Sequence, residues 1–126
     1  MKVLVFETSR DRAKLIRDLL GDYRYKIHVN YNGEQALADI RDVKPSLIIV
    51  NANTRPDSGY SILEKIKKDP RYSKIPVIFI SNFSSTELSM KVKKYPNVDY
   101  LVEPFKIKNF RHIVERWVNF RSLYVN

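Results

Sequence analysis

The sequence predicts an α/β fold in which a doubly wound, five-stranded parallel sheet is flanked by five helices. A short apolar run followed by a segment with helical hydrophobic periodicity recurs five times along the 126 residues. Four of the five runs are nearly continuous in apolar residues, as is typical of parallel strands that are covered on both faces. Because the chain is long enough for one hydrophobic core and too short for two, a single domain over residues 1–126 is expected.

The expected strands are the apolar runs themselves. They cover residues 3–6, 27–31, 47–50, 77–80 and 100–102. The second run differs from the others because its apolar members, Ile27, Val29 and Tyr31, alternate with polar residues. Prolines mark two of the boundaries, since Pro45 stands just before the third run and Pro76 opens the fourth.

The expected helices lie between the runs and carry apolar residues at helical spacing. Gly21 closes the first helix, whereas Gly33 and Gly59 precede the second and third. Pro70 follows the third helix, and Pro104 stands ahead of the last. The apolar positions, in chain order, are Ala13, Ile16 and Leu20; Leu37 and Ile40; Ile62 and Ile66; Leu88, Val92 and Tyr95; and Phe110, Ile113, Val114, Trp117, Phe120 and Tyr124.

The composition favours a cytoplasmic protein. No run approaches the roughly 18 consecutive apolar residues of a membrane helix, and Glu7 interrupts the apolar start before a signal-peptide core could form. The lack of cysteine excludes disulfides, thiolate metal sites and cysteine nucleophiles. The 23 Lys and Arg against 14 Asp and Glu give a net charge of +9, which suggests nucleic acid or an acidic protein as partner. Because the basic residues are dispersed, solvated helix faces explain them equally well, and nucleic acid is the weaker interpretation.

The polar residues at the strand ends are the candidate site, because ligands of doubly wound sheets bind beyond the carboxyl ends of the strands. Glu7 and Thr8 follow the first strand, and Asn51 follows the third. Ser81 follows the fourth strand and Glu103 the fifth. An amide thus stands where the third apolar run stops.

Several motifs, taken in order, indicate a known family. The segment "NGEQAL" enters the second helix, and Pro45 and Gly59 lie six residues before and eight residues after Asn51. The fourth strand reads "IPVIFIS" and the fifth "DYLVEPF". Over residues 2–120 the chain resembles the receiver domain of two-component response regulators, which is CheY-like. This resemblance implies a flavodoxin-like sheet with strand order 2-1-3-4-5.

The resemblance also assigns roles to the strand-end residues. In the family, two acidic residues end the first strand, a phosphoacceptor aspartate ends the third, a Thr or Ser ends the fourth, and a lysine precedes the proline after the fifth. By position, Glu7 and Thr8 take the acidic pair and Asn51 the phosphoacceptor. Ser81 takes the hydroxyl and Glu103 the lysine. Only Glu7 and Ser81 retain suitable groups, so the resemblance implies a degenerate phosphorylation site.

The chemistry of these side chains disfavours the family's reaction. An aspartyl phosphate forms through an anionic oxygen, and the neutral amide of Asn51 offers none. Magnesium prefers charged oxygens in an octahedral array, and only Glu7 remains of three carboxylates. Glu103 would repel an incoming phosphoryl group. We therefore expect no catalytic residue, no metal ion, no cofactor and no enzymatic activity.

These features predict a pseudo-receiver, that is, a phosphorylation-independent signalling module that binds a protein partner. The family commonly meets partners through the fourth helix, the fifth strand and the fifth helix. Whether the partner is acidic, or is a second copy of the chain in a homodimer, stays open. The candidate partner-binding residues on this surface are Lys91, Lys94, Tyr100, Lys106, Lys108 and Arg111.

Two alternatives remain. The first is a nonstandard phospho-switch or a metal-binding receiver, for which Ser81 and the pair of Glu7 and Glu103 are the only support. The second is a nucleic-acid-binding regulatory module, suggested by the net charge of +9. The first requires a chemical role for Ser81 or Glu103, and the second requires binding that weakens steeply with salt.

Overall fold

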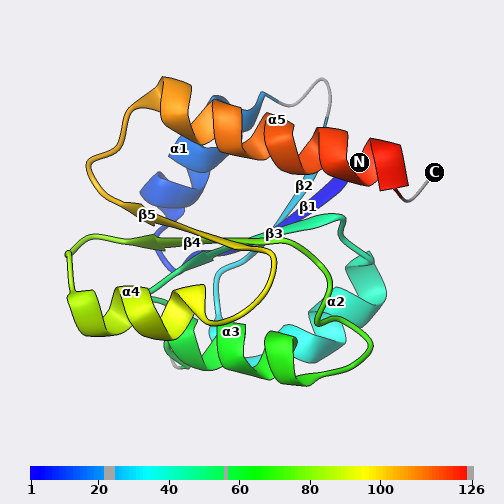
Figure 1. Cartoon of the computed structure of the whole chain (residues 1–126), viewed down its shortest axis with the longest axis horizontal. Helices are drawn as coiled ribbons and strands as arrows, with labels where there is room; N and C mark the ends of the chain where they lie inside the picture. Colours follow the sequence, from blue (N-terminus) through cyan, green and yellow to red (C-terminus); the bar gives the residue numbers. More distant parts are fainter. Residues whose placement is uncertain (22–24, 56, 125–126) are drawn as a thin grey trace.

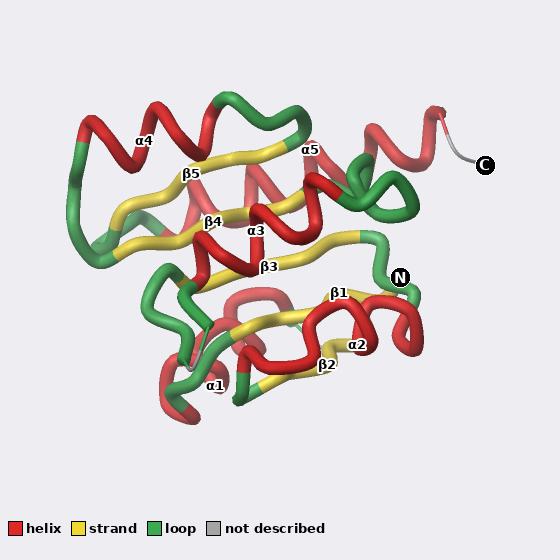
Figure 2. Tube along the Cα trace, turned by 90° about the horizontal axis from the view of Figure 1, so that it is seen from below, coloured by secondary structure: helices red, strands yellow, loops and turns green. Residues whose placement is uncertain are grey.

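Five parallel strands form one sheet in the order β2-β1-β3-β4-β5, which confirms the predicted fold and strand order (Figures 1 and 2). The computed structural model describes residues 1–21, 25–55 and 57–124, with side chains as far as Val118. Within these residues, the strands alternate with five α-helices and one 3₁₀ turn, η1. The elements are β1 (Lys2–Phe6), α1 (Arg10–Leu20), β2 (Lys26–Asn30), η1 (Gly33–Gln35), α2 (Ala36–Val43), β3 (Leu47–Asn51), α3 (Gly59–Lys68), β4 (Val77–Ser81), α4 (Thr86–Lys93), β5 (Val98–Val102) and α5 (Ile107–Tyr124).

The helices cover both faces of the sheet. α1 and α5 lie on one face, and α2, α3 and α4 lie on the other (Figure 1). Alternate strand residues enter two separate cores: Val3 and Val5 of β1 pack toward α1 and α5, whereas Leu4 and Phe6 pack toward α2, α3 and α4. Every residue of β3 and β4 is buried. These two central strands therefore contribute to both cores.

The strand ends differ from the apolar runs by one or two residues. Asn51 and Ser81 are the last residues of β3 and β4, because both join the parallel ladder. β5 begins at Val98, two residues before the apolar run that predicted it. β2 ends at Asn30, so the prediction that Tyr31 lies in this strand was wrong. Backbone pairing, which any residue except proline can make in full, sets a strand end, whereas an apolar run reports only burial.

α5 confirms the predicted apolar stripe as far as its side chains are described. Phe110 and Val114 are buried in the core beneath α1 and α5, and Trp117 packs against this core. Phe120 and Tyr124, the last predicted members of the stripe, lie outside the residues whose side chains are described. No helix in the described part of the chain has the length and hydropathy needed to cross a membrane.

Gly59 allows α3 to begin directly against the end of β3. It is the first residue of α3 rather than the residue before it, because the Ser58 side chain caps the helix by accepting a hydrogen bond from the Ser61 amide at 3.2 Å. The Gly59 amide donates to the carbonyl of Ala52 at 3.1 Å. A Cβ at Gly59 would lie 2.2 Å from the carbonyl oxygen of Asn51, far inside van der Waals contact. This close approach fixes the loop that follows Asn51.

Lys67 is a buried cation that fastens the connection between α3 and β4. Its Nζ donates hydrogen bonds to the carbonyl oxygens of Ser73 at 3.0 Å and Ile75 at 2.8 Å. Burial lowers the pKa of Lys67 from 10.5 to about 8. The loop is therefore stabilised by a side chain whose charged form is itself disfavoured by its surroundings.

Replacement of Gly59 by alanine tests the close approach. We expect Gly59→Ala to lower the free energy of unfolding by about 3 kcal/mol, because the new methyl group meets rigid backbone. Gly33→Ala is the matched control, since the nearest atoms there are the side-chain tips of Ile62 and Thr54, at 3.0 and 3.1 Å, which can shift. Urea unfolding measures both variants. Equal losses for the two would show that the Gly59 contact does not constrain the loop.

The lowered pKa of Lys67 makes stability depend on pH. Because the folded pKa lies below the unfolded value, the unfolded chain binds more protons between about pH 8 and 10.5, so the Lys67 contribution to stability rises across this window. We expect the free energy of unfolding of the wild type, minus that of Lys67→Met, to increase by roughly 2 kcal/mol between about pH 7.5 and about pH 9.5. Groups shared by the two proteins cancel in this difference. Parallel pH profiles in urea unfolding would contradict the prediction.

Candidate functional site

The carboxyl edge of the sheet brings the residues of the candidate site to one rim. Glu7 and Thr8 follow β1, and Asn51 and Ser81 end β3 and β4. Glu103 follows β5, and its amide donates a hydrogen bond to the carbonyl of Ser81 at 2.7 Å. The ends of β1, β3 and β4 and the β5–α5 loop therefore form one continuous surface.

Asn51 and Glu7 form the buried centre of this rim. Nδ2 of Asn51 donates a hydrogen bond to Oε1 of Glu7 at 2.8 Å. Oδ1 of Asn51 accepts a hydrogen bond from the backbone N–H of Asn53 at 2.8 Å. Asn51 is only 2% exposed and Glu7 only 3%. Both polar ends of the Asn51 amide are therefore already bonded within the protein and shielded from solvent.

Arg12, which sequence reasoning missed, supplies the positive charge of the rim. Ser9 caps α1 by accepting a hydrogen bond from the Arg12 amide at 3.3 Å, which places Arg12 in the first helical turn. Nε of Arg12 lies 3.5 Å from Oε1 of Glu7, and its guanidinium forms an ion pair with Oε2 of Glu103. We call Glu7, Arg12 and Glu103 the ionic cluster. The available signal was the pair of carboxylates at nearby strand ends, because buried carboxylates require a cationic partner.

The surroundings of Glu7 have opposing effects on the pKa of its carboxyl group. Burial raises the pKa of the Glu7 carboxyl, and the negative charge of Glu103 acts in the same direction. The hydrogen bond from the Ser9 amide, the charge of Arg12 and the hydrogen bond from Asn51 lower this pKa, without fully offsetting burial. The ionised form of Glu7 therefore depends on its bonded partners.

The hydroxyls of Thr8 and Ser81 are engaged by neighbouring loops. Oγ1 of Thr8 accepts a hydrogen bond from the Arg55 amide at 3.0 Å, which joins the loop after β1 to the loop after β3. Oγ of Ser81 accepts from the Phe83 amide at 3.2 Å and donates to the Phe83 carbonyl at 2.9 Å. Ser81 is buried, whereas Thr8 is exposed. Both hydroxyls thus close turns at the rim.

The side chains at the rim do not fit the magnesium ion that the resemblance implies. Oε1 of Glu7 contacts Asn51 and Arg12, and Oε2 accepts a hydrogen bond from the Ser9 amide at 3.1 Å. The Arg12 guanidinium pairs with both carboxylates, where a metal ion would need them as ligands. Among the described residues, no group of three or more His, Cys, Asp or Glu is arranged to hold a metal.

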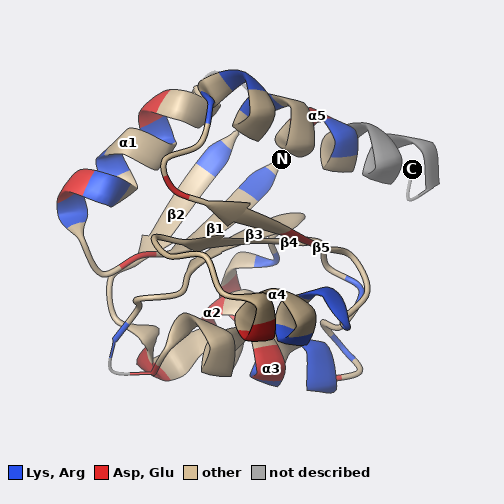
Figure 3. Cartoon of the chain, turned by 60° about the vertical axis from the view of Figure 1, so that its left-hand side comes forward, with Lys and Arg blue, Asp and Glu red and all other residues tan. Residues whose placement is uncertain are grey.

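Two of the candidate partner residues, Lys91 and Lys94, are partly engaged within the domain. Nζ of Lys91 lies 3.6 Å from Oε1 of Glu87 and 5.5 Å from the ring centre of Tyr60 on α3. Nζ of Lys94 lies 5.1 Å from the ring centre of Tyr95. Lys91 therefore projects toward α3. Figure 3 shows the basic positions gathered at the C-terminal part of α4.

The remaining candidates lie around β5 and the start of α5. Tyr100 is half-buried, its ring stacks on Phe79 with centres 6.0 Å apart, and its hydroxyl donates to the Phe83 carbonyl at 3.4 Å. Lys106 and Lys108 are exposed where α5 begins. Sequence reasoning missed two exposed apolar side chains, Phe83 (48% exposed) in the loop before α4 and Met90 (70% exposed) on α4. A lone apolar residue in a helix or loop carries no signal of its exposure.

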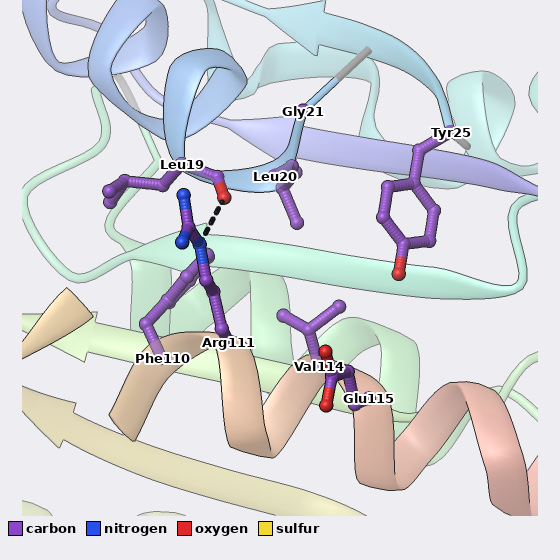
Figure 4. Close-up of a pocket in the computed structure, with 8 residues that line it drawn as sticks. All are labelled: Leu19, Leu20, Gly21, Tyr25, Phe110, Arg111, Val114 and Glu115. Atoms are coloured by element: carbon purple, nitrogen blue, oxygen red, sulfur yellow. Dashed lines mark hydrogen bonds between the residues drawn. The ribbon is translucent and has the colours of Figure 1, made fainter. Parts of the chain in front are cut away.

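Arg111 lies on the side of α5 that faces α1 (Figure 4), and it lines a surface hollow together with Lys108. Its Nε donates a hydrogen bond to the carbonyl of Leu19 near the end of α1 at 3.3 Å. Both residues line a pocket of about 230 Å³, with Tyr25, Val114 and Glu115 among the other lining residues. Arg111 therefore joins two helices on the face away from α4.

Comparisons with known proteins agree with this geometry. A solved signal receiver domain of a signal transduction histidine kinase from Syntrophus aciditrophicus has a TM-score of 0.83 at 23% identity, covering 94% of this chain and 90% of that one. The Francisella response regulator 1452 receiver domain has a TM-score of 0.80 at 25% identity, covering 94% and 98%.

Longer proteins contain a matching segment. The transcriptional regulatory protein ZraR of Salmonella typhimurium is 25% identical over 115 residues, which are 90% of this chain and 25% of that protein. The hybrid signal transduction histidine kinase D of Dictyostelium discoideum is 25% identical over 121 residues, 96% of this chain and 8% of that protein. The chain thus spans a quarter or less of the length of these relatives.

The family assignment follows from a match over most of the chain. A model of the response regulator receiver domain matches residues 3–115. The sheet order and the five alternating units agree with that match. The chain therefore belongs to the response regulator receiver domain family.

Proposed function

We propose that this receiver domain is a pseudo-receiver, which accepts no phosphoryl group and signals by binding a protein partner. The observation that carries the proposal is the hydrogen bond from the Asn51 amide to Glu7 at the end of β3, where the family has its phosphoacceptor aspartate. Receiver domains are signalling modules that interact with partners such as kinases and effectors. A binding role is therefore the part of the family's activity that this chain can retain.

The Asn51 side chain lacks the nucleophile that phosphoryl transfer requires. A carboxylate attacks phosphorus through a negatively charged oxygen, whereas an amide oxygen is neutral and the amide nitrogen's lone pair is delocalised. The Asn51 oxygen is also committed to the Asn53 amide at 2.8 Å. The only side-chain oxygen at this position is uncharged and already accepts a hydrogen bond. It is therefore a poor nucleophile, and the acyl phosphate does not form.

The ionic cluster further disfavours a phosphoryl group at the rim. Glu103 places a carboxylate where the family has a lysine, and two like charges a few ångströms apart repel strongly in a partly shielded site. Among the described residues, Arg12 is the only cation that pairs with Glu7 or Glu103, and it is shared between the two carboxylates. Binding an anion here would require Arg12 to leave a carboxylate unpaired, which is costly in a buried position.

We assign the partner-binding role to the surface formed by α4, β5 and the start of α5. Exposed apolar side chains are supplied by Phe83 and Met90, and Tyr100 adds a half-buried aromatic ring. Lys106 and Lys108 are exposed where α5 begins. Apolar side chains surrounded by charged ones are typical of protein interfaces. The positive charge of the lysines favours a partner with acidic groups.

Acetyl phosphate tests the loss of phosphoryl transfer. We expect no covalent phosphoryl adduct by intact mass after incubation of the wild type with acetyl phosphate and Mg²⁺, because no anionic nucleophile ends β3. Asn51→Asp alone should also stay unmodified, since Glu103 still repels the phosphoryl group. The triple variant Thr8→Asp, Asn51→Asp and Glu103→Lys should gain a Mg²⁺-dependent adduct. A stable adduct on the wild type would overturn the proposal.

Charge and polarity changes test the partner surface. We expect Met90→Asp combined with Lys93→Glu to reduce capture of the native partner at least about tenfold, because it introduces charge at an apolar anchor and reverses an exposed lysine. The capture uses lysate of the source organism in EDTA and without a phosphodonor. Leu15→Asp combined with Lys14→Glu, on the opposite side of the sheet in α1, makes the same change in charge and is the matched control. If both variants retain or lose the partner equally, this surface is not the interface.

A further inference from the structure

A pocket opens beside the rim, shares Glu7 and Glu103 with it, and extends away from Asn51 along α1. It opens between α1 and the β5–α5 connection and has a volume of about 320 Å³. Figure 1 shows α1 and α5 side by side on the same face of the sheet. We call this cavity the rim pocket. Its size falls near the lower end of the range, roughly 300–1,000 Å³, in which small-molecule sites occur.

Most of the rim pocket is apolar. Leu15, Ile16 and Leu19 line it from α1, and Phe105 and Ile107 line it from the β5–α5 connection. Leu15 is 55% exposed and Ile107 is 51% exposed, so apolar surface from both sides meets solvent. Exposed aliphatic side chains that line one cavity are unlike the single scattered apolar residues of an ordinary surface. The walls therefore suit the apolar body of a ligand.

One end of the rim pocket is ionic. The lining includes all three members of the ionic cluster, Glu7, Arg12 and Glu103. Two carboxylates and one guanidinium leave a single uncompensated negative charge. The Glu7 side chain is 4% exposed and the Glu103 side chain 28%, so Glu103 is the carboxylate within reach of a ligand. Its Oε2 is paired with the Arg12 guanidinium.

We propose that the rim pocket binds a small free amine, a molecule with an apolar body and one ammonium group. The ammonium would donate to Oε1 of Glu103, and the apolar body would lie between Leu15 and Ile107. This inference goes beyond the proposed function and does not depend on it. It concerns a ligand held beside the rim rather than a group transferred to it.

The charge of the cluster distinguishes an amine from other ligands. An ammonium brings the cluster to neutrality, whereas a carboxylate would add a third negative charge around one guanidinium. A neutral alcohol would forgo a charge-assisted hydrogen bond, which is roughly twice as strong as a neutral one. The net charge of +9 repels cations at long range, but this repulsion is largely screened beyond about 8 Å at physiological ionic strength. The nearby carboxylate of Glu103 therefore determines the preference for a cationic ligand.

The volume limits the size of the ligand. A cavity of about 320 Å³ equals about ten water volumes of roughly 30 Å³ each, which corresponds to a molecule of about ten non-hydrogen atoms. Hexylamine is smaller than this limit and is protonated at neutral pH. The side chain of a lysine in another protein offers the same ammonium, but its polar backbone would replace the distal apolar end. A free alkyl amine therefore matches the apolar walls of the rim pocket better than a lysine side chain does.

Nuclear magnetic resonance titration tests the proposal with four probes: hexylamine, hexan-1-ol, hexanoate and Nα-acetyl-lysinamide. We expect hexylamine to shift the backbone amide resonances of Leu15, Phe105 and Ile107 with a Kd in roughly the millimolar range. The other three probes should bind at least about tenfold more weakly, because each lacks either the positive charge or the apolar end.

Matched variants locate the interaction. Glu103→Gln should weaken hexylamine binding about tenfold, whereas Glu87→Gln, an exposed carboxylate on α4, should leave it unchanged. Leu15→Ser should also weaken it, with Met90→Ser on α4 as its control. Circular dichroism confirms that each variant is folded.

Several results would overturn the proposal. These are equal binding of hexylamine and hexan-1-ol, equal or tighter binding of hexanoate or the lysine derivative, no shift at the rim pocket, and insensitivity to Glu103→Gln. None of them bears on acetyl phosphate reactivity or on partner capture, so failure here is distinguishable from failure of the proposed function.

Discussion

A buried carboxylate that must be paired is the constraint on which the carboxyl edge of this domain depends. An unpartnered charge in a protein interior costs several kcal/mol, and Glu7 avoids this cost by accepting hydrogen bonds from the Ser9 amide and from Asn51 and by pairing with Arg12. Those partners come from the start of α1 and the end of β3. Arg12 extends the network to Glu103 after β5. Glu7 and Arg12 together thereby link three segments that are distant in the sequence.

The network also explains how the rim keeps its shape with altered charges. The sequence resemblance assigns Glu103 to a position where the family has a lysine, and Arg12 brings a guanidinium to Glu103 from α1. Attraction across the rim is therefore retained with its polarity reversed. The hydroxyls of Thr8 and Ser81 bond to adjacent loops, so these turns are closed by the chain itself.

Sequence patterns predicted the elements and the strand-end residues, because apolar periodicity reports burial and parallel strands share one carboxyl edge. They did not place Asn51 and Ser81 within strands, since ladder pairing extends past the last apolar residue. They also missed the bridge made by Arg12, because the reach of a long side chain depends on how α1 lies against the sheet. The sequence also did not predict that the Lys91 side chain points toward α3, because this depends on how α4 packs beside α3.

The complete burial of β3 and β4, against the partial exposure of β2 and β5, gives the sheet an uneven resistance to opening. Segments with few buried contacts fray at low free energy, whereas core strands open only when the whole domain unfolds. Fluctuations of the outer strands can therefore reshape the periphery without disturbing the central scaffold. A molecule that binds at β2 or β5 would therefore contact a more deformable part of the sheet than β3 and β4. Amide hydrogen exchange would be slowest in β3 and β4.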